Sequence, residues 1–174
     1  MAAFSKILIA NRGEIACRVI RTAHAMGYET VAVYSEADKN APHTKLATEA
    51  IAIGPASVSE SYLKIDNILE AARKTGADAI HPGYGFLSEN ADFAQACSAN
   101  DITFIGPSAS AITLMGNKAE AKRRMIDADV PCIPVYEGED QSDNHFIQAA
   151  DEIGFPVMVK AAAGGGGRGM RLVA

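Results

Sequence analysis

The sequence predicts an α/β protein whose leading part is an open, mostly parallel sheet of the doubly wound kind. Two observations carry this prediction. Short apolar runs of strand length alternate with segments in which apolar residues recur at helical spacing. The segments between successive runs are also long enough for the helical crossover that parallel strands require.

The first strand–helix–strand unit occupies the N-terminal part of the chain. KILIAN (6–11) predicts a buried strand, Gly27 closes the helix that follows, and TVAVY (30–34) predicts the next strand. The helix is indicated by apolar residues at helical spacing, namely Ile15, Ala16, Val19, Ile20, Ala23 and Met26.

The pattern then repeats. AIAIG (50–54) predicts a strand, and a helix that ends at Gly76 follows it. Residues 78–85 and 102–107 predict two further strands, separated by a helix near residues 90–99. The stripe of the helix before Gly76 consists of Ile65, Ile68, Leu69 and Ala72.

A second region begins around Ser110. One helix ends near Gly116, and Asn117 with Glu120 forms a capping-box pattern that starts another. Residues 129–143, with two prolines and several acids, predict a strand and a surface loop. A helix marked by Phe146, Ile147, Ala150 and Ile153 ends at Gly154 and Pro156.

The composition is that of a globular domain, with 48% hydrophobic and 21% charged residues. A formal net charge of −5 argues against a broad nucleic-acid or anionic-membrane surface. No apolar stretch has the length of a membrane span, and no signal peptide is evident, so we expect a cytoplasmic protein.

Cysteine and histidine give no sign of a metal site. Cys17, Cys97 and Cys132 are odd in number and far apart, which indicates reduced and mostly buried thiols. The four histidines are equally scattered, so structural roles are favoured for His24, His43, His81 and His145.

In parallel sheets ligands bind beyond the carboxyl ends of the strands. Those ends are ANRGE, YSEAD, HPGYGF and IGPSA. Glu36 or Asp38 stands where the ribose-binding acid of a dinucleotide site would be. The fingerprint of such a site, G-x-G-x-x-G, needs three glycines, and only Gly13 is present. We therefore interpret both acids as solvated loop residues.

The segment VMVKAAAGGGGRGMRLV (157–173) predicts a hairpin with four consecutive glycines at its tip. Glycine is the residue most costly to order, so the run indicates a need for bare backbone, such as N–H groups that bind phosphate. Lys160 projects near the tip, on the opposite side of its strand from Val159. The alternative is a mobile glycine linker beside a solvated lysine.

Two further places admit both a functional and a structural interpretation. Lys118 lies in the first turn of a predicted helix, where a cation is unfavourable unless an anion binds there. The alternative is that Lys118 is an ordinary surface lysine.

HPGYGFLSEN (81–90) predicts a shaped loop at the edge of the sheet where ligands bind. The alternative is a turn that packs Tyr84 and Phe86 on neighbouring helices.

Taken in order, IANRGEIACRVIRTA, HPGYGFLSEN, FIGPS, LMGNK and the glycine segment closely resemble the N-terminal part of biotin carboxylase, an ATP-grasp enzyme. The resemblance covers essentially the whole chain. It implies a Rossmann-like domain over residues 1–114 and the truncated start of an ATP-grasp domain, with the beginning of its lid, over residues 115–174.

The resemblance also implies site residues and ligands. Lys118 and Lys160 match lysines that contact the nucleotide phosphates, and Met170 matches a residue on the adenine side. Tyr84 and Gly85 match positions near biotin. The lid loop corresponds to Gly164, Gly165, Gly166 and Gly167. The implied ligands are ATP, Mg²⁺ and bicarbonate, with biotin on a carrier protein as substrate and carboxyphosphate as intermediate.

In the family, the magnesium ligands and the catalytic base lie downstream of the glycine loop. The resemblance therefore implies an inactive fragment with no catalytic residue of its own. It also implies a carboxyltransferase subunit as partner and a homodimer of the full module, with Arg18 and Arg21 near the contact. GEDQSD and NKAEAKRRM favour an acyl-CoA carboxylase α subunit of the methylcrotonyl or geranyl type.

Two alternatives remain at this point. In the first, the chain is a stand-alone module that associates through the helix of Arg18 and Arg21. In the second, the chain belongs to another ATP-grasp ligase.

Overall fold

The computed structural model describes residues 4–136, 138, 140–160 and 169–174, except the side chains of residues 118 and 119. The chain forms two compact units, Met1–Asn117 and Lys118–Ala174. Each unit is described by itself.

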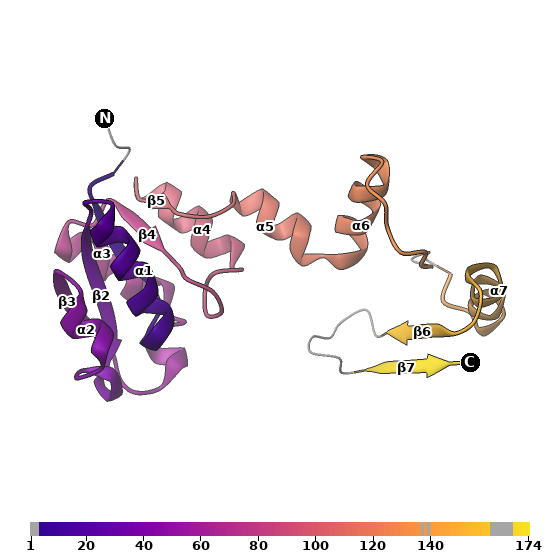
Figure 1. Cartoon of the computed structure of the whole chain (residues 1–174), viewed down its shortest axis with the longest axis horizontal. Helices are drawn as coiled ribbons and strands as arrows, with labels where there is room; N and C mark the ends of the chain where they lie inside the picture. The colour runs from indigo at the N-terminus through magenta and orange to yellow at the C-terminus, as the bar shows by residue number, and fades with distance from the viewer. Residues whose placement is uncertain (1–3, 137, 139, 161–168) are drawn as a thin grey trace. The chain divides into compact units, whose positions relative to one another are not determined.

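The first unit is built on a five-stranded parallel sheet, the indigo-to-pink part of Figure 1. The strand order is β3-β2-β1-β4-β5, which confirms the predicted parallel α/β fold. In β1, Ile7 pairs with Thr30 on one side and with Ala79 on the other. The strands are β1 (Lys6–Ile9), β2 (Glu29–Ser35), β3 (Glu49–Gly54), β4 (Ala79–His81) and β5 (Thr103–Phe104).

Helices cover both faces of this sheet, as the doubly wound prediction requires. The α-helices of the unit are α1 (Gly13–Ala25), α2 (Pro42–Leu46), α3 (Ile65–Thr75), α4 (Ala91–Ala99) and α5 (Ala109–Gly116), with short 3-10 helices η1 (Glu36–Asp38) and η2 (Val58–Glu60). The predicted C-terminal stop of α3 is confirmed, because Gly76 caps it in the left-handed conformation.

Side chains alternate between the two faces along each central strand. In β1, Leu8 joins the apolar cluster beneath α3 and α4, whereas Ile7 and Ile9 join the cluster beneath α1. Because both faces are buried, the strand is apolar at consecutive positions, which is the pattern that the sequence shows.

The predicted strands 78–85 and 102–107 are much shorter in the structure. β4 stops at His81 because Gly83, Gly85 and Phe86 have positive φ angles of 66°, 71° and 44°, which a strand cannot accommodate. β5 contains only Thr103 and Phe104. The prediction that residues 82–85 continue the strand is therefore wrong.

The second unit contains α6 (Lys118–Asp127), α7 (Asp143–Ile153) and an antiparallel hairpin of β6 (Val157–Lys160) and β7 (Met170–Val173). The predicted hairpin and the helix that ends at Gly154 are confirmed. The strand predicted within 129–143 is absent from the described residues of that segment, where Pro131 and Pro134 offer no N–H to a ladder.

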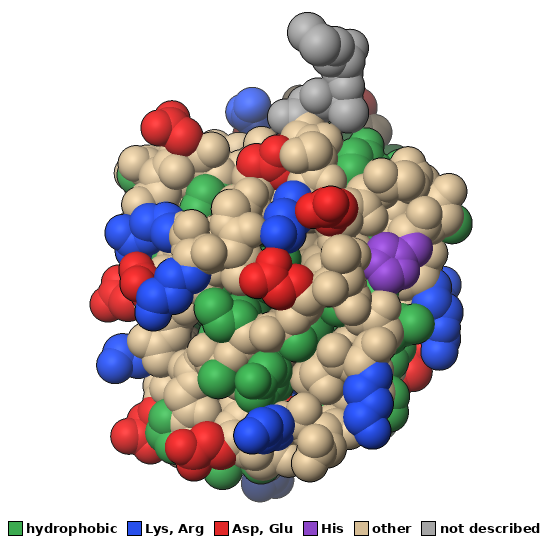
Figure 2. All heavy atoms as spheres, turned by 90° about the vertical axis from the view of Figure 1, so that its left-hand side faces the viewer, with side chains coloured by type: hydrophobic (Ala, Val, Ile, Leu, Met, Phe, Trp, Pro, Cys, Tyr) green, Lys and Arg blue, Asp and Glu red, His purple; other side chains and the backbone are tan. Residues whose placement is uncertain are grey.

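On the face of the first unit in Figure 2, acidic and basic side chains are interspersed around an apolar area. Among the described residues, no helix is long and apolar enough to cross a membrane.

Candidate functional site

The central strand of the first unit is the point where the winding of the sheet reverses. From β1 the chain adds β2 and β3 on one side, and later β4 and β5 on the other. Loops that leave neighbouring strands toward opposite faces open a crevice at such a point, and ligands bind there. The turn after β1 and the loop after β4 are the two segments that meet at this place.

The loop after β4, residues 82–87, has a backbone that forms few bonds of its own. The Gly83 N–H donates to Nδ1 of His81 at 3.0 Å, and the Ser88 N–H donates to the Gly85 carbonyl at 2.9 Å. Gly83 is required for a second reason besides its φ angle. A Cβ there would lie 2.7 Å from Nδ2 of Asn11.

Asn11 joins the two segments. Its side chain is buried, and its amide Nδ2 donates to the Pro82 carbonyl at 2.9 Å and to the Tyr84 carbonyl at 3.0 Å. Its Oδ1 accepts from the Arg12 N–H at 2.9 Å, just before α1 begins. The amide therefore bonds both segments at once, which satisfies polar groups that burial would otherwise leave unpaired.

Arg12 lies against two stacked rings. Its guanidinium carbon is 5.4 Å from the Tyr62 ring centre and 5.6 Å from that of Phe86, and the rings stack with centres 5.1 Å apart. Its Nη1 is 3.1 Å from Oδ2 of Asp38. Cation–ring attraction and an ion pair thus act on the same side chain.

Asp38 has a structural role that the sequence interpretation missed. Its Oδ2 accepts from the Tyr62 hydroxyl at 2.7 Å, from Ser35 Oγ at 3.0 Å and from Arg12. Burial raises the pKa of Asp38, but these hydrogen bonds outweigh burial and hold the pKa below its ordinary value. The prediction of a solvated acid is wrong for Asp38, whereas Glu36 is exposed.

Tyr62 is the buried partner in this cluster. Burial, reinforced by the neighbouring Asp38 carboxylate, raises the pKa of its hydroxyl to about 12. The hydroxyl is therefore protonated at neutral pH and donates to Asp38.

Tyr84 and Gly85 lie at the exposed tip of the loop. The Tyr84 side chain is 63% exposed, so the prediction that it packs on a neighbouring helix is wrong. Phe86 does pack inward, against the core cluster beneath α3 and α4. The loop thus presents Tyr84 and Gly85 to solvent between two anchored ends.

The second unit contains the other predicted site residues. Lys160 pairs with Met170 at the loop end of the hairpin, so both lie where the glycine segment leaves and rejoins the strands. Lys160 is exposed and has no ion-pair partner among the described residues. The glycine loop, Gly164–Gly167, lies outside the described residues.

Lys118 is the first residue of α6, and its side chain lies outside the described part of the chain. The capping box predicted for Asn117 and Glu120 stays a prediction.

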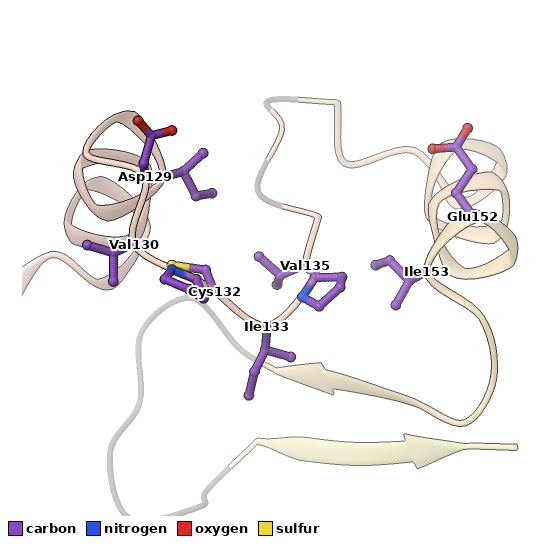
Figure 3. A pocket seen from close by; sticks show the side chains of 10 residues that line it. Asp129, Val130, Cys132, Ile133, Val135, Glu152 and Ile153 are labelled. Carbon is purple, nitrogen blue, oxygen red and sulfur yellow. The ribbon is translucent and has the colours of Figure 1, made fainter.

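The second unit also has a hollow of about 570 Å³ between residues 126–135 and the end of α7. Figure 3 shows the carboxylates of Asp129 and Glu152 at the upper rim and Ile133 on the lower side. The lining is mainly aliphatic and contains none of the predicted site residues.

Other titratable groups provide no additional site. The three cysteines are free thiols, and burial raises the pKa of Cys97 to about 11. Burial lowers the pKa of His43, whose Nε2 bonds the Val33 carbonyl. Its buried Nδ1 has no hydrogen-bond partner in the described part of the chain, so the structural role expected for His43 is supported at one ring nitrogen. Within the described ranges, no group of three or more acidic, histidine or cysteine side chains could hold a metal ion.

The parallel sheet identifies the first unit as a doubly wound α/β domain, and the second unit that follows it contains a glycine-rich hairpin. The chain belongs to the biotin carboxylase family: residues 3–112 match the family described as "Biotin carboxylase, N-terminal domain". Residues 117–174 match "Carbamoyl-phosphate synthase L chain, ATP binding domain". The resemblance stated from the sequence is thereby confirmed.

Curated relatives are subunits of acyl-CoA carboxylases. The mitochondrial methylcrotonoyl-CoA carboxylase subunit alpha of Dictyostelium discoideum is 59% identical over 97% of this chain. The mitochondrial propionyl-CoA carboxylase alpha chain of Rattus norvegicus is 55% identical over the same share. The chain spans about a quarter of these relatives, 24% and 23% of their lengths.

Solved structures give the same family. A biotin carboxylase–β-γ-ATP complex from Campylobacter jejuni matches with a TM-score of 0.89 and 54% identity, over 98% of this chain and 38% of that one. The biotin carboxylase domain dimer of the Hydrogenobacter thermophilus 2-oxoglutarate carboxylase, with MgADP, ADP and bicarbonate, matches with a TM-score of 0.85 and 50% identity, over 97% and 37%.

Proposed function

We propose that this chain provides the leading domain and the start of the nucleotide lid of a biotin carboxylase. The complete module uses ATP and bicarbonate to form carboxyphosphate, whose carboxyl group passes to biotin on a carrier protein. We propose that residues 1–114 form the leading α/β domain and that residues 115–174 form the start of the ATP-grasp domain. The family match and the acyl-CoA carboxylase relatives support this assignment.

One observation carries the nucleotide part of the proposal. The register of the hairpin pairs Lys160 with Met170 at its loop end, on either side of the glycine segment. An ammonium group there can neutralise a phosphate oxygen, and glycine N–H groups can bind others without side chains in the way. We assign phosphate binding to Lys118, Lys160 and Gly164–Gly167, and the adenine side to Met170.

These groups hold ATP in place and offset the charge of its phosphates, which favours attack by bicarbonate at the γ-phosphoryl group. Among the described residues, no group of three or more acidic, histidine or cysteine side chains could hold Mg²⁺. Since the chain spans about a quarter of its curated relatives, we propose that these 174 residues alone are catalytically incomplete.

Biotin recognition is proposed for the loop of Tyr84 and Gly85 in the first unit. A flat, exposed tyrosine at the switch point of the sheet suits a ring such as that of biotin. The partners we propose are a biotin carrier domain, a carboxyltransferase subunit and a second copy of the module, with Arg18 and Arg21 exposed on α1 for the dimer contact.

Two finer assignments are also proposals. The acyl-CoA substrate is of the methylcrotonyl or geranyl class, although the relatives include a propionyl-CoA enzyme as well. The cytoplasmic location is a proposal too, since the named relatives are mitochondrial. Fractionation of source cells with an antibody to this chain tests the location.

The nucleotide assignment is tested in a protein that joins this chain to the remainder of the Campylobacter jejuni biotin carboxylase, hereafter the joined protein. Lys160→Ala removes a charge-assisted contact, so ATP affinity measured by calorimetry falls by about 1.5–3 kcal/mol. Arg171→Ala is the matched control, because Arg171 pairs with Val159 and faces the other side of the hairpin. Equal ATP affinity in both variants would contradict the assignment.

A further inference from the structure

The turn after β1 contacts the loop after β4 through hydrogen bonds and ring contacts of Asn11 and Arg12. We propose that Asn11 and Arg12 are positioning residues: they fix the loop that presents Tyr84 and Gly85, and their benefit to catalysis rests on the proposed biotin role of that loop.

The bonds of Asn11 determine the path of the loop backbone. Its single amide group donates to the Pro82 carbonyl at 2.9 Å and to the Tyr84 carbonyl at 3.0 Å, on either side of Gly83. Because Gly83 and Gly85 are left-handed, these carbonyls cannot take part in a strand ladder. Their hydrogen-bond donor is instead Asn11, which comes from another segment of the chain. Gly83 lies so close to Asn11 that there is no room for a Cβ at this position.

Arg12 holds the other end of the loop. Its guanidinium lies over the Phe86 ring, at 5.6 Å, and over the Tyr62 ring stacked on it. Asp38 fixes that guanidinium at 3.1 Å, and the same carboxylate oxygen binds the Tyr62 hydroxyl. Phe86 is thus anchored from the turn after β1, from η1 and from the segment before α3, although its own φ of 44° is unfavourable for a side chain.

Gly85 lies between the anchored Tyr84 carbonyl and Phe86, and both Tyr84 and Gly85 are exposed to solvent. A ligand that binds an already ordered loop does not have to supply the free energy of ordering it. Loss of either anchor therefore weakens ligand binding, expressed as KM, more than it changes the rate constant of the chemical step.

The test begins with the 174-residue chain, using hydrogen exchange followed by mass spectrometry. Asn11→Ala removes both donated bonds, so the Gly83 amide, which donates to His81, exchanges about 5- to 30-fold faster in peptides that cover residues 82–87. Asn67→Ala is the matched control, because Asn67 donates in the same way to the Ile53 carbonyl at 2.7 Å and the Glu60 carbonyl at 3.2 Å. The control leaves exchange at 82–87 unchanged.

A second variant keeps the test valid if the buried Asn11→Ala change prevents folding, which circular dichroism reports. Arg12→Met keeps the aliphatic stem of a side chain that is 42% exposed and removes the charge over the rings. Exchange at residues 82–87 becomes about two- to fivefold faster. Exchange that stays at the wild-type rate in every folded variant would overturn the inference.

The joined protein separates this inference from the proposed function. There, Asn11→Ala raises KM for free biotin severalfold with kcat nearly unchanged, and Asn67→Ala does neither. If the loop exchanges faster but KM for biotin does not change, Asn11 still positions the loop, and it is the biotin role of the loop that fails.

Discussion

The two units differ in how much of their apolar surface they bury. In the first unit both faces of the sheet are covered, and residues such as Leu8, Ile20 and Phe93 are fully buried. In the second unit, Ala121 and Ala149 are the buried hydrophobic residues among those described, while Ile133 is 84% exposed. The hairpin leaves Met158, Val159, Met170, Leu172 and Val173 exposed as well.

The first unit is the part of the chain that holds its own fold. Helical and hairpin signals suffice to define α7 and β6–β7 locally, but most of the free energy of folding comes from burial, and an isolated hairpin is marginal in water. The first unit has its own core, whereas the second needs a surface to pack on. The relatives, about four times as long, contain further chain that could provide it.

The largest expected effect is in hydrogen exchange of the 174-residue chain. Amides of β1 and β2 open only with global unfolding, and those of α7 and the hairpin open locally, so their protection differs by on the order of 10⁴-fold. Equal protection in both units, measured by mass spectrometry, would show that the second unit is as stable as the first.

A matched pair of aromatic residues gives the next largest effect. Phe93 in α4 is buried and meets Phe104 edge-on at 5.8 Å, whereas Phe146 in α7 is 38% exposed and meets Tyr136 edge-on at the same distance. We expect Phe93→Ala to lower the free energy of unfolding of the first unit by about 3–5 kcal/mol in urea titrations. Phe146→Ala leaves that transition unchanged, since it removes no contact in the first unit; a loss of similar size would show that the units share one core.

Two glycines of the first unit separate the cost of backbone conformation from the cost of close packing. Gly76 and Gly83 both have a φ of 66°, but only at Gly83 would a Cβ meet another side chain, at 2.7 Å. Gly76→Ala costs about 1–2 kcal/mol for its backbone conformation, and Gly83→Ala about 1–3 kcal/mol more. Equal losses in thermal unfolding would mean that the loop moves freely away from Asn11.

The smallest expected effect is a pH dependence confined to the first unit. Burial lowers the pKa values of His43 and His81. Below the ordinary imidazole pKa of about 6.5 the unfolded chain therefore binds more protons than the folded one, and the free energy of unfolding falls as the pH falls. We expect a lower urea midpoint at pH 5 than at pH 7.

The control for that effect is the pair His43→Gln and His81→Asn, which keeps a donor for Val33 and an acceptor for Gly83 without a group that titrates. A midpoint difference between pH 5 and pH 7 that is as large in this double variant would assign it to other groups.

Much of the fold could be predicted because apolar periodicity specifies it. Consecutive apolar residues in 6–11 and 30–34 indicate strands buried on both faces, and Gly76 and Gly154 mark the helix ends. The lengths of β4 and β5 could not be predicted, since they depend on where the chain turns into left-handed backbone and on pairing with neighbours.

The candidate site was only partly accessible to sequence reasoning. Motif spacing indicated Lys160 and the loop of Tyr84 as candidates, because both lie in unusual glycine-rich segments, and their roles stay predictions. It missed Arg12 and Asp38, which meet only when β1 and β2 lie side by side. The available signal was that ANRGE, YSEAD and HPGYGF all follow strands, but strand order decides which of them meet.

We propose that the first unit offers a preformed loop, whereas the hairpin of the second unit binds the nucleotide. Hydrogen exchange of the joined protein with and without ATP tests it most directly. We expect ATP to slow exchange in peptides covering β6 and β7 and to leave residues 82–87 unchanged. Slower exchange at 82–87 with no change in the hairpin would contradict it.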